Sequence, residues 1–444
     1  MRKSPLRAVA VLASMLITAV TVFAQSGSTR PRRVVRQTTQ TQKSASTDNT
    51  PPPLLEVEPA NSTSTGRRRN TNNATTTTSD APLLNTTAST PVAVDPATNP
   101  NGVVGSNSAA GTARAFSLLQ QKDYAGALRE AKQVVATNPE DSDAWKIAGF
   151  AELNLKQYEA SATDLQKALD LQRVAKQEDP FTVDALGHAY FLADKFDRAL
   201  PMLIITTSRK DAKPDAITLY YRGVAEYQTK KPTDAERTFN AIVKDNPKDA
   251  AALFYLGQIA FERNDLDGAI AALNRATMND ARLVSAWNLL TLAYLQRAGM
   301  ATTPEKADAE YASAVRAGEG LTRVRTDVEA NVLFAQALVA AKQFVRSASV
   351  LERFVAAADA SPSALYLYGI SQSRAKNFPR AISALERAST KTPDDANIYR
   401  ELGYAYEISK LYAKALTAYE RGMALAPNDA DFKESAERVR PYAK

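Results

Sequence analysis

Residues 362–395 read PSALYLYGISQSRAKNFPRAISALERASTKTPDD, and residues 396–429 read ANIYRELGYAYEISKLYAKALTAYERGMALAPND. The two stretches have the same length and match at fixed offsets. Gly369 and Gly403 occupy the same offset in the two stretches, and most of the large apolar, small and proline positions recur in the same way. A fixed period of this length is typical of a repeat protein, and it outweighs shorter motifs in predicting the fold.

The same period runs through most of the chain before residue 362. A small residue recurs in the first half of each unit, and in eight of the nine units a second small residue follows twelve positions later. Two helices pack at the short end of the range of about 8–10 Å only where their side chains are small. We therefore predict nine helical hairpins, which begin at residues 108, 142, 180, 216, 250, 284, 328, 362 and 396.

These residues resemble the tetratricopeptide repeat family, whose unit is a helix-turn-helix of about 34 residues with this pattern of small, aromatic and proline positions. The resemblance covers residues 108–429. It implies an all-α fold, a right-handed superhelical solenoid of about nine repeats.

Two features at the irregular positions add to this prediction. The unit that begins at residue 284 is 44 residues long, and its ten additional residues fall around Ala298–Ala307. Thr303 and Pro304 predict the cap and first-turn proline of a resumed helix there. We interpret this loop either as a tolerated insertion or as a partner contact. Residues 430–444 are predicted to form the polar capping helix of the solenoid end and a short tail.

The N-terminal sequence predicts an export signal over residues 1–24. Arg2, Lys3 and Arg7 precede an apolar run that ends in Val22-Phe23-Ala24, where short residues favour cleavage after Ala24. An uncleaved anchor is the alternative, but the run falls short of the ~20 apolar residues that a spanning helix needs. The chain has no cysteine for lipid attachment. We therefore expect a periplasmic or secreted protein.

A linker is predicted over residues 25–107. This segment has 26 Ser and Thr residues, nine prolines and no aromatic residue. Such a composition cannot bury enough apolar area to offset its conformational entropy, so we expect a disordered tether. Its basic groups, such as Arg67-Arg68-Arg69, could contact the envelope peripherally, and its two Pro-Leu-Leu pieces could be docking motifs.

The overall composition excludes several classes of function. The chain has no cysteine and a single histidine, His188, which rules out thiolate and multi-histidine metal sites. Its net charge is +7, but the segment 1–107 accounts for six of these charges, so the repeats lack the positive field of a nucleic-acid-binding protein. No catalytic or phosphate-binding motif is present in a suitable context. We expect a non-enzymatic protein without cofactor or metal.

The resemblance also implies where partners bind. In the family, the first helix of each repeat lines an inner groove, with the second, fifth, ninth and twelfth residues of the unit facing it. Carried over to this chain, the partner-binding residues are Phe116, Lys146, Phe150, His188, Tyr220, Tyr227, Phe254, Gln258, Phe261, Asn288, Gln336, Tyr366, Arg400 and Tyr404. Aromatic side chains there would anchor an extended protein segment.

These observations predict a protein-protein interaction scaffold or adaptor of the bacterial cell envelope that binds extended partner segments in the groove. The alternative is a structural subunit of an envelope export or surface-polymer assembly machine, which docks through its outer face or its ends.

Overall fold

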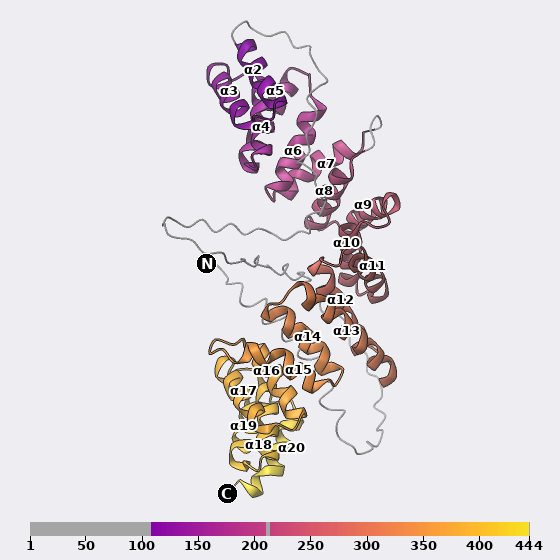
Figure 1. Cartoon of the computed structure of the whole chain (residues 1–444), viewed down its shortest axis with the longest axis vertical. Helices are drawn as coiled ribbons and strands as arrows, with labels where there is room; N and C mark the ends of the chain where they lie inside the picture. The colour runs from indigo at the N-terminus through magenta and orange to yellow at the C-terminus, as the bar shows by residue number, and fades with distance from the viewer. Residues whose placement is uncertain (1–107, 210–213, 444) are drawn as a thin grey trace. The chain divides into compact units, whose positions relative to one another are not determined.

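The computed structural model describes residues 108–209 and 214–443 (Figure 1). This part of the chain contains 19 α-helices, one short 3-10 helix and no β-strand, which confirms the all-α prediction. The first helices of the hairpins are α2 (Ser108–Gln120), α4 (Ser142–Asn154), α6 (Pro180–Leu192), α8 (Ala216–Gln228), α10 (Ala250–Glu262), α12 (Val284–Gly299), α14 (Val328–Ala340), α16 (Pro362–Arg374) and α18 (Ala396–Ile408). The second helices are α3 (Tyr124–Thr137), α5 (Tyr158–Val174), α7 (Phe196–Thr207), α9 (Pro232–Asp245), α11 (Leu266–Asn279), α13 (Pro304–Val324), α15 (Phe344–Val355), α17 (Phe378–Lys391) and α19 (Tyr412–Leu425).

The helices divide into two compact units at Arg263 and Asn264. The N-terminal unit holds α2 to α10, and the C-terminal unit holds α11 to α19 with the terminal helices α20 (Ala430–Val439) and η2 (Arg440–Tyr442). In each unit a first helix packs against its own second helix and against neighbouring first helices, as with α2 and α4 or α14 and α16. The first helices therefore share one face of each unit, which we call the first-helix face.

Side-chain caps explain why most first helices begin where the repeat period predicts. Asp141 accepts a hydrogen bond from the backbone N–H of Ala144 at 2.9 Å, and this satisfies a donor that the helix leaves free. The same device begins most of the other first helices and also α20, at Asp179, Asp215, Asp249, Asp327, Ser361, Asp395 and Asp429.

The predicted small residues lie where the two helices of a hairpin cross. A Cβ added to Gly149 would lie 2.5 Å from Cγ of Leu165 on the partner helix, so only glycine fits between these helices. The second small residue, Ser161, donates a hydrogen bond to the carbonyl oxygen of Gly149 at 2.7 Å. The small pair therefore sets the closest approach of α4 and α5, as predicted.

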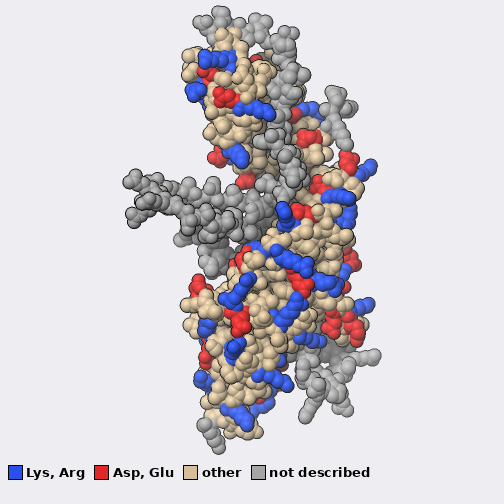
Figure 2. Space-filling model, viewed as in Figure 1, with Lys and Arg blue, Asp and Glu red and all other residues tan. Residues whose placement is uncertain are grey.

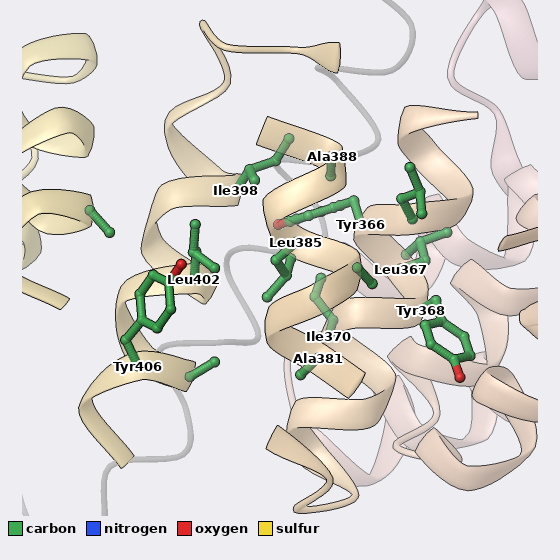
Figure 3. Packing of buried hydrophobic residues seen from close by; sticks show 14 of the residues in the cluster. Tyr366, Leu367, Tyr368, Ile370, Ala381, Leu385, Ala388, Ile398, Leu402 and Tyr406 are labelled. Atoms are coloured by element: carbon green, nitrogen blue, oxygen red, sulfur yellow. The ribbon is translucent and has the colours of Figure 1, made fainter. Parts of the chain in front are cut away.

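An apolar core runs through the successive hairpins from α14 to α20 in the C-terminal unit. In Figure 3, Leu385 of α17 lies among side chains from α16 and α18, including Leu402 and Tyr406. Leu385 has no exposed surface, and Leu402 is 5% exposed. Each hairpin buries apolar surface only together with its neighbours, which is the expected behaviour of a repeat array.

The long sixth repeat differs from the prediction in one respect. Thr303 accepts a hydrogen bond from the backbone N–H of Lys306 at 3.3 Å, and Pro304 opens α13, as the sequence indicated. However, residues 298–299 end α12 and residues 304–307 begin α13, so the predicted loop is mostly helical. The additional residues lengthen both helices. The first helix α12 has 16 residues where α4, for example, has 13. The second helix α13 has 21 residues, whereas the longest other second helix, α5, has 17.

The capping helix predicted at the C-terminal end is α20. It buries Phe432, Ala436 and Val439 against the last repeat. Its remaining side chains are mostly charged, and the surface of both units carries basic and acidic side chains side by side (Figure 2). This is consistent with the near-neutral charge of the repeats.

The predicted signal, residues 1–24, and the predicted linker, residues 25–107, lie outside the described residues. No helix between residues 108 and 443, the gap at 210–213 apart, has the length and apolar character needed to cross a membrane.

Candidate functional site

The predicted partner-binding residues all lie on first helices, but they differ in exposure. Five are buried: Phe150, His188, Tyr220, Phe254 and Tyr366. Eight are half-buried: Phe116, Lys146, Tyr227, Gln258, Phe261, Asn288, Gln336 and Arg400. Only Tyr404 among these fourteen is exposed, with 39% of its surface accessible.

Burial changes the role of the aromatic residues in the N-terminal unit. Tyr220 is 4% exposed, and its ring centroid lies 6.3 Å from that of Phe239 and 6.0 Å from that of Tyr255. Phe254 is 7% exposed, and its ring centroid lies 5.3 Å from that of Tyr255. These rings fill the space between helices, so they present little surface for a ligand.

Two half-buried residues of the first-helix face in the N-terminal unit, Tyr227 of α8 and Gln258 of α10, contact each other. The Gln258 amide nitrogen donates to the Tyr227 hydroxyl at 2.8 Å, and that hydroxyl donates to Glu262. Burial and this hydrogen bond to the carboxylate raise the pKa of Tyr227. Glu262 was not predicted, because it lies one position beyond the family's groove positions.

The amide oxygen of Gln258 is an unsatisfied acceptor. It is covered by its surroundings and has no hydrogen-bond partner among the described residues. The side chain as a whole is half-buried. A covered acceptor without a donor is unfavourable, so a ligand donor that reaches this oxygen is favoured.

His188 takes part in a series of two hydrogen bonds. Its Nε2 lies 2.8 Å from the hydroxyl oxygen of Thr218, and that hydroxyl donates to Asp215 at 2.7 Å. Because the Thr218 proton is used, Nε2 must be the protonated nitrogen that donates to Thr218. Burial lowers the pKa of His188. The neutral imidazole thus fastens α6 to the start of α8.

Lys146 is also occupied by contacts within the chain. Its ammonium group forms ion pairs with Asp143 at 3.0 Å and with Asp179 at 3.1 Å. Asp179 caps the first helix of the next repeat, so this lysine links two consecutive repeats.

In the C-terminal unit the exposed Tyr404 lies beside two arginines. The guanidinium of Arg374 lies 5.1 Å from the centre of the Tyr404 ring and pairs with Glu401 at 2.9 Å. Arg400 pairs with Asp429 and stacks on Phe432. The aromatic ring and its cation form a half-open surface at the end of the array.

A buried acidic pair lies between the first two repeats and was not predicted. Glu152 of α4 is 3% exposed and Asp164 of α5 is 4% exposed, and both contact the ammonium group of Lys132 on α3. Lys132 approaches Glu152 to 3.2 Å. One cation therefore serves two carboxylates. Burial, followed by repulsion from Asp164, raises the pKa of Glu152 to about 7.

This pair predicts a pH dependence of stability. Between pH ~4.5 and ~7 the folded chain holds a proton on Glu152, whereas the unfolded chain releases it. The contribution of Glu152 to the free energy of unfolding therefore falls as the pH rises through that window. Glutamine does not titrate, so Glu152→Gln does not lose stability in this way as the pH rises. The stability of this variant relative to wild type should therefore rise by about 1–2 kcal/mol between pH ~5 and ~8, measured by urea unfolding. An equal difference at both pH values would contradict the raised pKa of Glu152.

The comparisons with known proteins agree with this architecture. A sequence profile of the tetratricopeptide repeat matches residues 112–180, 185–243, 230–282 and 369–430, which together make up slightly more than half of the chain. No curated protein sequence matches the chain.

Several solved structures resemble the chain. A tetratricopeptide repeat protein from Parabacteroides merdae is 14% identical, with 59% of this chain and 98% of that one covered and a TM-score of 0.38. YrrB, described as a tetratricopeptide repeat protein with an unusual peptide-binding site, is 18% identical over 45% of this chain and 97% of its own, with a TM-score of 0.36. MamA from Desulfovibrio magneticus is 19% identical over 40% and 96%, with a TM-score of 0.35. At these identities and TM-scores the neighbours carry no information on what this chain binds. With its repeated helical hairpins and the matching profile, the chain belongs to the tetratricopeptide repeat family, whose repeats are scaffolds for protein-protein interaction.

Proposed function

We propose that this chain is an exported, non-enzymatic scaffold of the bacterial cell envelope that binds an extended segment of a partner protein along its first-helix faces. The export signal and linker expected from residues 1–107 support the location. The binding mode rests on one observation, the unpartnered amide oxygen of Gln258 beside Tyr227 and Glu262.

This arrangement suits an extended backbone. A peptide N–H can donate to the Gln258 oxygen, which has no donor of its own within the described residues. The carboxylate of Glu262, on an exposed residue, can accept a second hydrogen bond from the same segment. Tyr227 supplies a half-buried ring that adds apolar contact at a low cost in side-chain entropy.

The burial of Tyr220 and Phe254 determines which variants can test this function. Alanine at either position would open a cavity in the core, so a loss of binding would not be separable from a loss of folding. Gln258 and Tyr227 are half-buried and can be changed with less effect on the core.

The test is photo-crosslinking in living cells at Gln258, with Val345 as the matched control. Val345 is 74% exposed on the second helix α15. We expect a defined partner to be captured at Gln258 and not at Val345. The isolated partner should then bind Gln258→Ala/Tyr227→Phe at least tenfold more weakly, with the thermal midpoint within a few degrees of wild type. Unchanged affinity in this double variant would contradict groove binding.

A second function is favoured by a different observation. Ile204 and Ile205 of α7 are 37% and 42% exposed, at the position where α17 carries Glu386 and Arg387. Exposed apolar side chains on a second helix suit docking into a larger assembly. A crosslinker at Ile205 that captures a partner, while one at Gln258 does not, would support a structural subunit of an envelope machine instead.

A further inference from the structure

Three lysines occupy the same place in three consecutive repeats of the C-terminal unit. Lys342, Lys376 and Lys410 each form the turn between a first and a second helix, one repeat period apart, and all three are exposed. Their φ angles are 58°, 64° and 61°, in the left-handed region. We call these three residues the lysine row.

Lysine is not the residue that this backbone favours. A positive φ is adopted most readily by glycine, and among other residues by asparagine and aspartate. Asn264 and Asp194 occupy the equivalent turns after α10 and α6, whereas lysine also occupies those after α2, α4 and α8. The local conformation therefore does not explain the three lysines, and it disfavours them relative to glycine.

The positive charge of the lysine row is largely free. Lys376 and Lys410 form no ion pair with any residue that the structure describes. Lys342 has one such contact, with Asp308 at 3.7 Å, and both side chains are more than half exposed. An exposed pair at this distance contributes little to stability and leaves the ammonium group accessible.

A second cation lies four residues after each lysine of the row, and each of these second cations is paired with a glutamate. Arg346 pairs with Glu319 on the preceding second helix. Arg380 pairs in the same way with Glu352 at 2.9 Å, and Lys414 with Glu386 at 3.5 Å. These pairs connect successive second helices. These three cations are therefore neutralised within the chain, unlike Lys376 and Lys410.

The spacing of the row suits a linear ligand. The first helices α14, α16 and α18 pack against one another in order, so successive lysines are separated by roughly the 8–10 Å between packed helices. A lysine ammonium is a flexible point charge without the planar fork that selects one bidentate partner. A ligand with isolated charges at regular intervals along an extended chain can contact all three.

We propose that the lysine row binds a linear anionic polysaccharide, with carboxylates of every second sugar unit on successive repeats. The neighbouring side chains favour a sugar chain over an acidic protein segment. Asn377, next to Lys376, offers an amide group that can hydrogen-bond with sugar hydroxyls. Gln343, next to Lys342, offers its amide nitrogen, because its oxygen accepts from Arg346 at 3.2 Å. This surface belongs to the C-terminal unit and shares no residue with the site at Tyr227 and Gln258, so it does not depend on peptide binding.

The experiment measures binding of the purified full chain to polygalacturonate at low salt, with dextran as the uncharged comparison. The variant is Lys342→Gly/Lys376→Gly/Lys410→Gly. Because glycine suits a positive φ, its thermal midpoint should equal or exceed that of wild type, so any loss of binding is not caused by unfolding. We expect the affinity to fall at least tenfold.

The matched control is Lys122→Gly/Lys156→Gly/Lys230→Gly in the N-terminal unit. These lysines have the same backbone conformation, with φ of 62°, 60° and 62°, but Asp194 interrupts their order. The control removes the same charge and keeps the basic residues before residue 108, and its affinity should stay within twofold of wild type. Equal loss in both variants, no loss in the first, or tighter binding of poly-glutamate than of polygalacturonate would overturn the proposal.

Discussion

Replacing Phe239 with alanine is expected to destabilise the N-terminal unit by about 3–5 kcal/mol. The Phe239 ring on α9 has no exposed surface and stacks on Tyr255 of α10, with ring centroids 4.8 Å apart and planes 4° from parallel. It also fills the space beside α8, because a Cβ added to Gly223 would lie 2.8 Å from its Cε1 atom. One side chain therefore joins three consecutive helices, and its removal leaves a cavity among them.

Phe181→Ala in the same unit is the matched control. Phe181 lies on α6 and is 38% exposed, so the same change in side chain removes much less buried area. Urea unfolding should show a shift of at most about 1 kcal/mol for the control. Hydrogen exchange should show the loss of protection in Phe239→Ala concentrated in α8, α9 and α10, since each repeat contacts mainly its neighbours. Equal shifts in the two variants would show that Phe239 is not a core residue.

The starts of the hairpins were predictable because they depend on local signals. Asp249, for example, directly precedes the repeat predicted to begin at residue 250, and its carboxylate caps α10 by accepting the N–H of Ala252. The small residues were predictable for a related reason. Gly223 must be small because the two helices of its hairpin cross there, and the same crossing recurs in each repeat.

The exposure of the binding residues was not predictable from their position in the repeat. Tyr220 and Tyr404 both lie at predicted groove positions, yet one is 4% and the other 39% exposed. Tyr220 is enclosed because Phe239 and Tyr255 pack against it from two other helices. Tyr404 lies in the last full repeat, which only the short helices α20 and η2 follow among the described residues. Burial depends on which rings the neighbouring repeats contribute, and a periodic pattern does not contain that information.

The buried acidic pair illustrates a second limit. Glu152, Lys132 and Asp164 lie on three different helices, so no helical period places them on one face. The pattern of small and aromatic positions that defines the repeat does not include them either. The sequence alone therefore gives no reason to group these three residues. Their contact follows from the packing of α3 against α4 and of α4 against α5.

Gly369→Ala is expected to destabilise the C-terminal unit by about 1–3 kcal/mol, although alanine is the better helix former by about 1 kcal/mol. A Cβ at this position would lie 2.5 Å from Cγ of Leu385 and 2.7 Å from its Cδ2 atom. Leu385 has no exposed surface and lies within the core between α16, α17 and α18, so it has no free space into which it can move (Figure 3). The helices must separate, and the contacts of both neighbouring hairpins weaken.

Gly299→Ala makes the same chemical change in the same unit and should have the opposite sign. Gly299 is the last residue of α12, and a Cβ there would meet no atom within 4 Å. Its only consequences are a better helix former in the folded state and a less flexible unfolded chain, which together stabilise by up to about 1 kcal/mol. Urea unfolding of the two variants therefore separates helix propensity from helix contact. Stabilisation at both positions would mean that the hairpin crossing at Gly369 can open without cost, and that the small residues of the repeat do not set the helix spacing.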